Sequence, residues 1–198
     1  MTAAEWLECD RPDEMLAAVR GTTSNRKWML FACGCLRLDG TAVPNGGQIA
    51  DMMEEINDQK QLSGRAGSVF AAITTVLSGN VSGMIAQSLS LSGQEPGTLA
   101  GIVSALCRNA EPHSRPQADL LRELLGDPFR FTFDAKWRSE AVVGIAVGIE
   151  SERAWDRMPI LADALQDAGC DDESVLDHCR EDRCHLRGCW VVDGCLGK

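Results

Sequence analysis

Apolar side chains recur at intervals of three or four residues along most of the chain. One stripe consists of Met15, Leu16 and Val19, and another runs from Trp28 to Cys35. Residues with this spacing lie on one face of an α-helix, which can be buried against neighbouring helices. The pattern therefore predicts an all-α fold, a multi-helix bundle of short helices.

Local signals predict where several helices begin and end. Thr2 and Glu5 are spaced as a capping box, and Pro12 stands in the first turn of the next helix. Asp134 is expected to cap a helix that runs to Ile149. Further helices are predicted over 23–36, 49–56, 69–77, 99–106, 117–125, 155–168, 173–179 and 190–196.

Two segments depart from this pattern. Apolar and polar residues alternate over 129–133, which predicts at most one short extended segment there. The middle of the chain, 61–110, is rich in Ser, Gly and Ala, and 78–97 fits either closely packed small-residue helices or a mobile segment. Because no internal repeat and no linker stands out, residues 1–198 are interpreted as a single helical domain.

Composition and charge narrow the classes of function. The 44% hydrophobic and 24% charged residues are typical of a globular protein. The formal net charge of -10 repels phosphate backbones, which argues against nucleic-acid binding. No secretory signal stands at the start. The longest apolar stretch, 141–149, is too short to span a bilayer. We therefore expect a cytoplasmic protein that does not bind membranes, with reduced cysteines.

The C-terminal segment holds the clearest candidate chemistry. Cysteine thiolates and histidine imidazoles are natural zinc ligands, and four suffice for a closed structural site. No Cys-x-x-Cys motif occurs, so the alternative is that these cysteines are small buried hydrophobic residues. Six Cys and His residues lie within one short stretch: His178, Cys179, Cys184, His185, Cys189 and Cys195. The predicted metal ligands are Cys179, Cys184, His185 and Cys189, with zinc as the candidate cofactor.

A thiol-redox role is a second interpretation of the same segment. Cys184 stands between Arg183 and His185, and a cationic neighbour can lower the pKa of a thiol. The alternative is an inert thiol beside a surface arginine. The chain has no Gly-x-Ser-x-Gly elbow and no phosphate-binding Gly-rich loop, so no catalytic or cofactor-binding residue is predicted.

Several segments also resemble a known family. They are 2–7, 24–35, 117–130, 161–170 and 185–193, which include Trp28-Met29-Leu30-Phe31-Ala32-Cys33 and Gly188-Cys189-Trp190-Val191-Val192-Asp193. In these segments the chain is similar to a large paralogous family of planctomycete bacteria with no known activity. The family often has two consecutive cysteines where this chain has Cys35-Leu36. The resemblance implies an evolutionary relationship with this family, but it does not indicate a function.

Two functions follow from the sequence as hypotheses. The first is a non-enzymatic helical module that binds an unidentified protein partner, because the chain combines helical patterning, an acidic surface and no assembled catalytic motif. The alternative is a zinc-stabilised or thiol-redox protein that uses the C-terminal Cys/His cluster.

Overall fold

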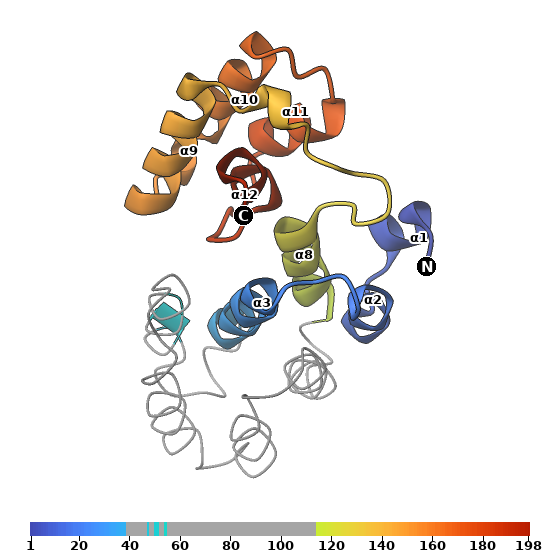
Figure 1. Ribbon diagram of the computed structural model, residues 1–198. Helices are drawn as coiled ribbons and strands as arrows, with labels where there is room; N and C mark the ends of the chain where they lie inside the picture. The colour runs from blue at the N-terminus through green and yellow to red at the C-terminus, as the bar shows by residue number, and fades with distance from the viewer. Residues whose placement is uncertain (39–46, 48–49, 52–53, 55–113) are drawn as a thin grey trace. The chain divides into compact units, whose positions relative to one another are not determined.

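The computed structural model describes residues 1–38, 47, 50–51, 54 and 114–198 (Figure 1). These residues form eight α-helices and two 3-10 turns, and no strand is found among them. The all-α prediction is confirmed for this part of the chain. The helices predicted over 69–77 and 99–106, the middle segment 61–110 and most of 49–56 lie outside the described residues.

The chain divides into two compact units, which we call unit 1 (1–122) and unit 2 (123–198). Helix α8, Ser114–Leu125, runs across the boundary and contributes residues to both units. The interpretation of residues 1–198 as a single helical domain stays a prediction.

Unit 1 begins with three helices: α1 (Ala3–Glu8), α2 (Pro12–Val19) and α3 (Asn25–Leu38). The predicted capping box is confirmed, because the Thr2 side chain accepts a hydrogen bond from the Glu5 backbone and the Glu5 carboxylate accepts one from the Thr2 backbone. Pro12 occupies the first turn of α2, where its missing N–H costs no helical bond. Local signals therefore decide where these helices begin.

Helix α8 follows the predicted apolar pattern closely. Leu120, Leu121 and Leu124 are buried, and Leu120 fits against Gly34 of α3, where a Cβ atom would lie 2.4 Å from the leucine side chain. Arg122 donates hydrogen bonds to the backbone carbonyls of Trp6, at 3.0 Å, and Cys9. These contacts hold α8 in unit 1 up to Arg122.

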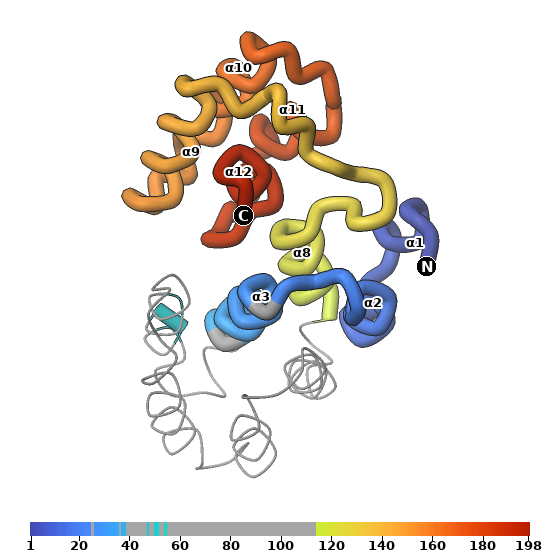
Figure 2. Tube along the Cα trace, viewed as in Figure 1, coloured from blue at the N-terminus to red at the C-terminus, as the bar shows by residue number. Residues whose placement is uncertain are grey.

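Unit 2 contains four further helices that pack in a closed series (Figures 1 and 2). Helix α10 packs on α9 and α11, and α12 also packs on α9 and α11. Their inward faces form one apolar core that includes Ile149, Leu161 and Val191. The bounds are α9 Glu140–Glu152, α10 Met158–Asp167, α11 Glu173–Arg180 and α12 Trp190–Leu196, with 3-10 turns at Ala135–Trp137 and Trp155–Arg157.

One predicted helix is divided in two. Asp134 caps only the 3-10 turn Ala135–Trp137, and Arg138 leaves the helical region with φ -78° and ψ 59°. Ser139 then caps α9, because its hydroxyl accepts a hydrogen bond from the Val142 backbone at 3.3 Å. The prediction of a continuous helix from Asp134 to Ile149 was wrong, since it did not recognise Ser139 as the stronger start signal.

Residues 129–133 connect α8 to this helical core. Gly126 ends α8 with φ +62°, a conformation that glycine adopts without strain. Phe131 packs edge-to-face on Trp190 with ring centroids 4.5 Å apart, and Phe133 packs similarly on Trp137 at 5.3 Å. The segment is thus pinned by aromatic contacts, without strand pairing among the described residues.

None of the helices in the described ranges combines the length and apolar character needed to cross a bilayer.

Candidate metal centre

Helix α11 supplies the first side chain of a buried polar cluster. Asp172 caps this helix by accepting a hydrogen bond from the Ser174 backbone at 2.9 Å. Val175, His178 and Cys179 then fall on its buried face, three or four residues apart. His178 therefore points into the core of unit 2, where only 6% of its surface is exposed.

The segment between α11 and α12 supplies two more side chains. His185 lies in this connection and is 7% exposed. Cys189 directly precedes α12 and is fully buried. Gly188 adopts φ +88°, a left-handed conformation that turns the chain just before Cys189.

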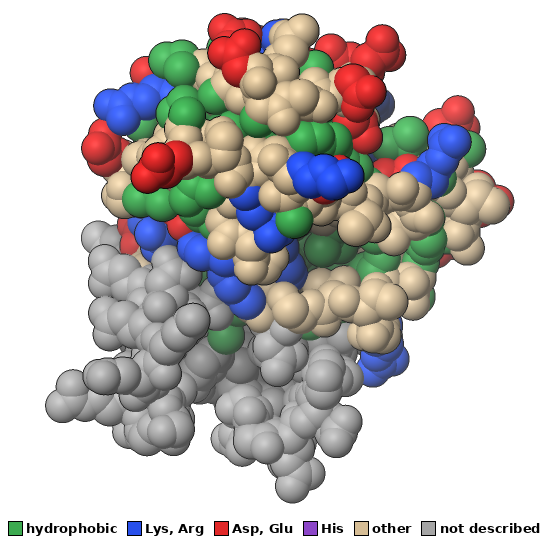
Figure 3. Space-filling view, turned by 45° about the horizontal axis from the view of Figure 1, so that its top comes forward, with side chains coloured by type: hydrophobic (Ala, Val, Ile, Leu, Met, Phe, Trp, Pro, Cys, Tyr) green, Lys and Arg blue, Asp and Glu red, His purple; other side chains and the backbone are tan. Residues whose placement is uncertain are grey.

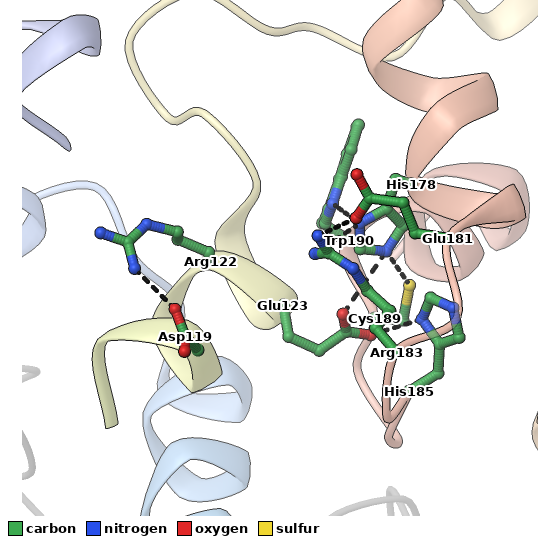
Figure 4. Close-up of polar contacts among 9 residues, drawn as sticks. All are labelled: Asp119, Arg122, Glu123, His178, Glu181, Arg183, His185, Cys189 and Trp190. Atoms are coloured by element: carbon green, nitrogen blue, oxygen red, sulfur yellow. Dashed lines mark hydrogen bonds and ion pairs between the residues drawn. The ribbon is translucent and has the colours of Figure 1, made fainter. Parts of the chain in front are cut away.

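The fourth side chain comes from the last turn of α8. Glu123 belongs to unit 2 and is 4% exposed, although a carboxylate on the buried face of a helix is costly without a partner. Its position three residues after the buried Leu120 explains the burial, because residues three apart lie on the same face of a helix. The close-up in Figure 4 shows Glu123 reaching toward the two histidines.

The polar atoms of these four residues converge, and we call Glu123, His178, His185 and Cys189 the EHHC cluster. One ligand atom from each residue lies within 4.8 Å of all the others. His178 Nε2 is 3.1 Å from Cys189 Sγ, and His185 Nδ1 is 3.1 Å from Glu123 Oε1 (Figure 4). His178 Nε2 also lies 3.5 Å from Glu123 Oε2.

Three of these separations are close to the edge length of a zinc coordination tetrahedron, and the two that reach Glu123 use its two different oxygens. Ligands placed tetrahedrally at about 2.0–2.3 Å from zinc lie roughly 3.3–3.5 Å from one another. The two nitrogen–oxygen distances and the nitrogen–sulfur distance fall within a few tenths of an ångström of that range. The donor set of nitrogen, sulfur and oxygen is also one that zinc accepts.

The electrostatics of the cluster favour a bound cation. Burial, the neighbouring His185 and the Arg183 charge together lower the pKa of His178 to about 3, so this imidazole is neutral at ordinary pH. Burial and the nearby Glu123 raise the pKa of the Cys189 thiol well above its usual value. Glu123 Oε2 is buried without a hydrogen-bond partner. A carboxylate in this setting lacks a permanent positive partner, which a divalent ion would supply.

Two donors surround the outer nitrogen of His178. Trp190 donates its indole N–H to His178 Nδ1 at 3.1 Å, and an Arg183 guanidinium nitrogen lies 3.4 Å from the same atom. Because both groups are N–H donors, they fix the ring orientation and hold His178 Nδ1 as a hydrogen-bond acceptor. Figure 3 shows no histidine on the face that it draws, as expected for side chains held inside unit 2.

The structure brings together two of the four predicted ligands. His185 and Cys189 belong to the EHHC cluster, whereas Cys184 is exposed and Cys179 lies in the apolar core beside Cys195. Burial raises the pKa of the Cys179 thiol, as expected for a packing residue. Cys33 and Cys35 are buried in unit 1 and are not members of this cluster.

The prediction did not include Glu123 or His178 among the ligands. His178 belonged to the noted Cys/His stretch, but its spacing from His185 fits no short zinc motif. Glu123 had one signal: it interrupts the inward-facing leucines of α8 with an acidic residue. A carboxylate at such a position is worth considering as a ligand, because charges are rarely buried alone.

Comparison with known proteins adds no assignment: no family model, no curated protein and no solved structure matches the chain.

Proposed function

We propose that this protein is a zinc-stabilised helical protein, with Glu123, His178, His185 and Cys189 as the four ligands. The observation that carries the proposal is their convergence, with one ligand atom from each within 4.8 Å of the others and no residue more than 7% exposed. One carboxylate and one thiolate carry two negative charges, which Zn²⁺ neutralises while the imidazoles stay neutral. The resulting buried centre has no net charge.

The role proposed for this metal is structural. Catalytic zinc sites keep a coordination position open for water or substrate, whereas structural sites fill all four with protein ligands. The EHHC cluster supplies four ligands and is closed to solvent. It connects Glu123 of α8 with His178 of α11 and with the segment before α12, and Glu123 and His185 are 62 positions apart in the sequence.

Metal analysis of the purified full-length chain tests the proposal. We expect one zinc per chain in the wild type, and a loss of affinity of more than about 100-fold in Cys189→Ser, beyond the 10- to 100-fold typical of losing an outer-shell partner. Cys184→Ser is the matched control, because Cys184 lies in the same segment but is exposed. Equal losses from the two variants, or no zinc bound by the wild type, would refute the assignment.

The second candidate function is binding of a protein partner, the role expected from the sequence. It is compatible with the zinc proposal, because a zinc-stabilised fold could serve as the binding module. Val147 on α9 and Ile160 on α10 are 49% and 55% exposed, and these two helices pack against each other. Exposed apolar side chains on neighbouring helices favour contact with another protein. Co-purification of a partner with the wild-type chain is the measurement that bears on this role.

A further inference from the structure

The hydrogen bonds around His178 determine which of its nitrogens carries a proton. The Trp190 indole nitrogen and the Arg183 guanidinium can only donate hydrogen bonds. Both face His178 Nδ1, at 3.1 and 3.4 Å, so Nδ1 must be the acceptor. In the neutral ring the proton then lies on Nε2, which faces Cys189 Sγ and Glu123 Oε2.

Zinc requires the opposite arrangement. A neutral histidine binds metal through its unprotonated nitrogen and carries its proton on the other one. Ligation through His178 Nε2 would place that proton on Nδ1, directly opposite the indole N–H of Trp190. Two donors would then face each other across 3.1 Å, with no acceptor between them.

We propose that zinc binding and the Trp190–His178 hydrogen bond exclude each other, so that Trp190 opposes metal loading and its indole N–H is released when zinc binds. The inference rests on the proposed zinc site. The protons balance as follows: His178 loses one proton from Nε2 and gains one at Nδ1, so the ring stays neutral, and the Cys189 thiol releases its proton to solvent when it binds zinc as a thiolate. Trp190 is thus a positioning residue that acts on the metal through His178.

Of the two donors to His178 Nδ1, Trp190 is held in place more firmly than Arg183 and therefore opposes zinc binding more strongly. Arg183 is 39% exposed and also bonds Glu181, so its side chain can turn away from His178. Trp190 has less freedom, because its ring packs on Phe131 at 4.5 Å and on the backbone of Gly126. It also directly follows the ligand Cys189, at the start of α12. Release of its N–H therefore requires a movement at the first turn of that helix.

The variant Trp190→Phe tests this inference by removing one N–H while keeping an aromatic ring. Because the hydrogen bond stabilises only the metal-free state, its loss should tighten zinc binding by about three- to tenfold, the range set by one neutral hydrogen bond. Trp155→Phe is the matched control, since Trp155 packs on the same core without belonging to the EHHC cluster. We expect its zinc affinity to be unchanged.

A second readout uses the wild type and does not depend on whether the variant folds. In the metal-free protein the Trp190 indole N–H should be protected from hydrogen exchange, and zinc should abolish that protection. Zinc binding that is weakened or unchanged in Trp190→Phe, or protection that persists with zinc, would overturn the inference and leave the zinc site standing. If the wild type binds no zinc, the site itself fails, and this inference fails with it.

Discussion

At the scale of single residues, the EHHC cluster places ionisable groups where water cannot reach them. A buried carboxylate or imidazolium loses several kcal/mol of hydration unless an opposite charge or hydrogen bonds compensate. His178 responds by remaining neutral, with burial as the main cause of its lowered pKa. Glu123 has His185 as its hydrogen-bond partner through Oε1, and its other oxygen has none. The cluster is thus satisfied only in part without a cation.

His178 should make the metal-free protein sensitive to acid. Its pKa is about 3 in the folded chain against 6.5 as the ordinary value. Between these values the unfolded chain binds a proton that the folded chain does not. The free energy of unfolding should therefore fall as the pH drops from 6.5 toward 3, by up to about 1.4 kcal/mol per pH unit.

Urea unfolding in the presence of a chelator measures this effect in the wild type and in His178→Gln. The variant keeps a polar side chain but cannot take up a proton, so its stability should depend less on pH across this window. Parallel pH profiles for the two proteins would show that His178 is not the group responsible.

At the scale of elements, helix ends are set by short-range chemistry and by close packing. Ser139, Asp172 and Thr2 each accept a backbone hydrogen bond at a helix start. Gly126 ends α8 in a left-handed conformation, and a Cβ atom there would lie 2.7 Å from the Trp190 ring. The end of α8 therefore depends on both backbone freedom and the absence of a side chain.

The substitution Gly126→Ala should destabilise the protein by about 1–3 kcal/mol, because it adds backbone strain and overpacks the Trp190 ring. Gly144→Ala is the matched control: Gly144 lies within α9 with nothing within 4 Å of its would-be Cβ. That change should stabilise by about 0.5–1 kcal/mol through helix propensity. Thermal unfolding of both variants provides the comparison, and the same sign of effect from both would contradict this account of Gly126.

At the scale of the whole molecule, the proposed zinc acts as a cross-link within unit 2. The metal would connect residues 62 positions apart, so the folded state gains binding free energy that the unfolded chain cannot use. Unit 2 spans only residues 123–198, and a core of this size supplies little stability to spare.

Chelation of the zinc should therefore lower the thermal midpoint of the wild type. Free zinc at 1,000 times its Kd would stabilise the fold by about 4 kcal/mol. We expect Cys189→Ser to melt at the same temperature with and without chelator, because it has lost the thiolate ligand. A wild-type midpoint that does not respond to chelator or to added zinc would show that the cluster does not stabilise the fold through a metal.

The amino-acid sequence by itself determined the helical character of the described residues and several of their helix ends. The signals are local: the Thr2–Glu5 capping box, Pro12 in a first turn and Gly169 after α10 each act within a few residues. Such interactions can be read from neighbours in the chain, because a helix turn brings together residues three or four apart. The Asp134 prediction failed on the same local scale, where Ser139 caps instead.

Only the tertiary structure decided which chemical groups meet. Cys184 and His185 are adjacent in the chain, yet one is exposed and the other is buried against Glu123. Cysteine and histidine content marked the C-terminal segment as a candidate, but the packing of α8 brought in the carboxylate. The physical reason is that ligand geometry depends on which helix faces are buried together, and no short-range spacing encodes a contact across 62 positions.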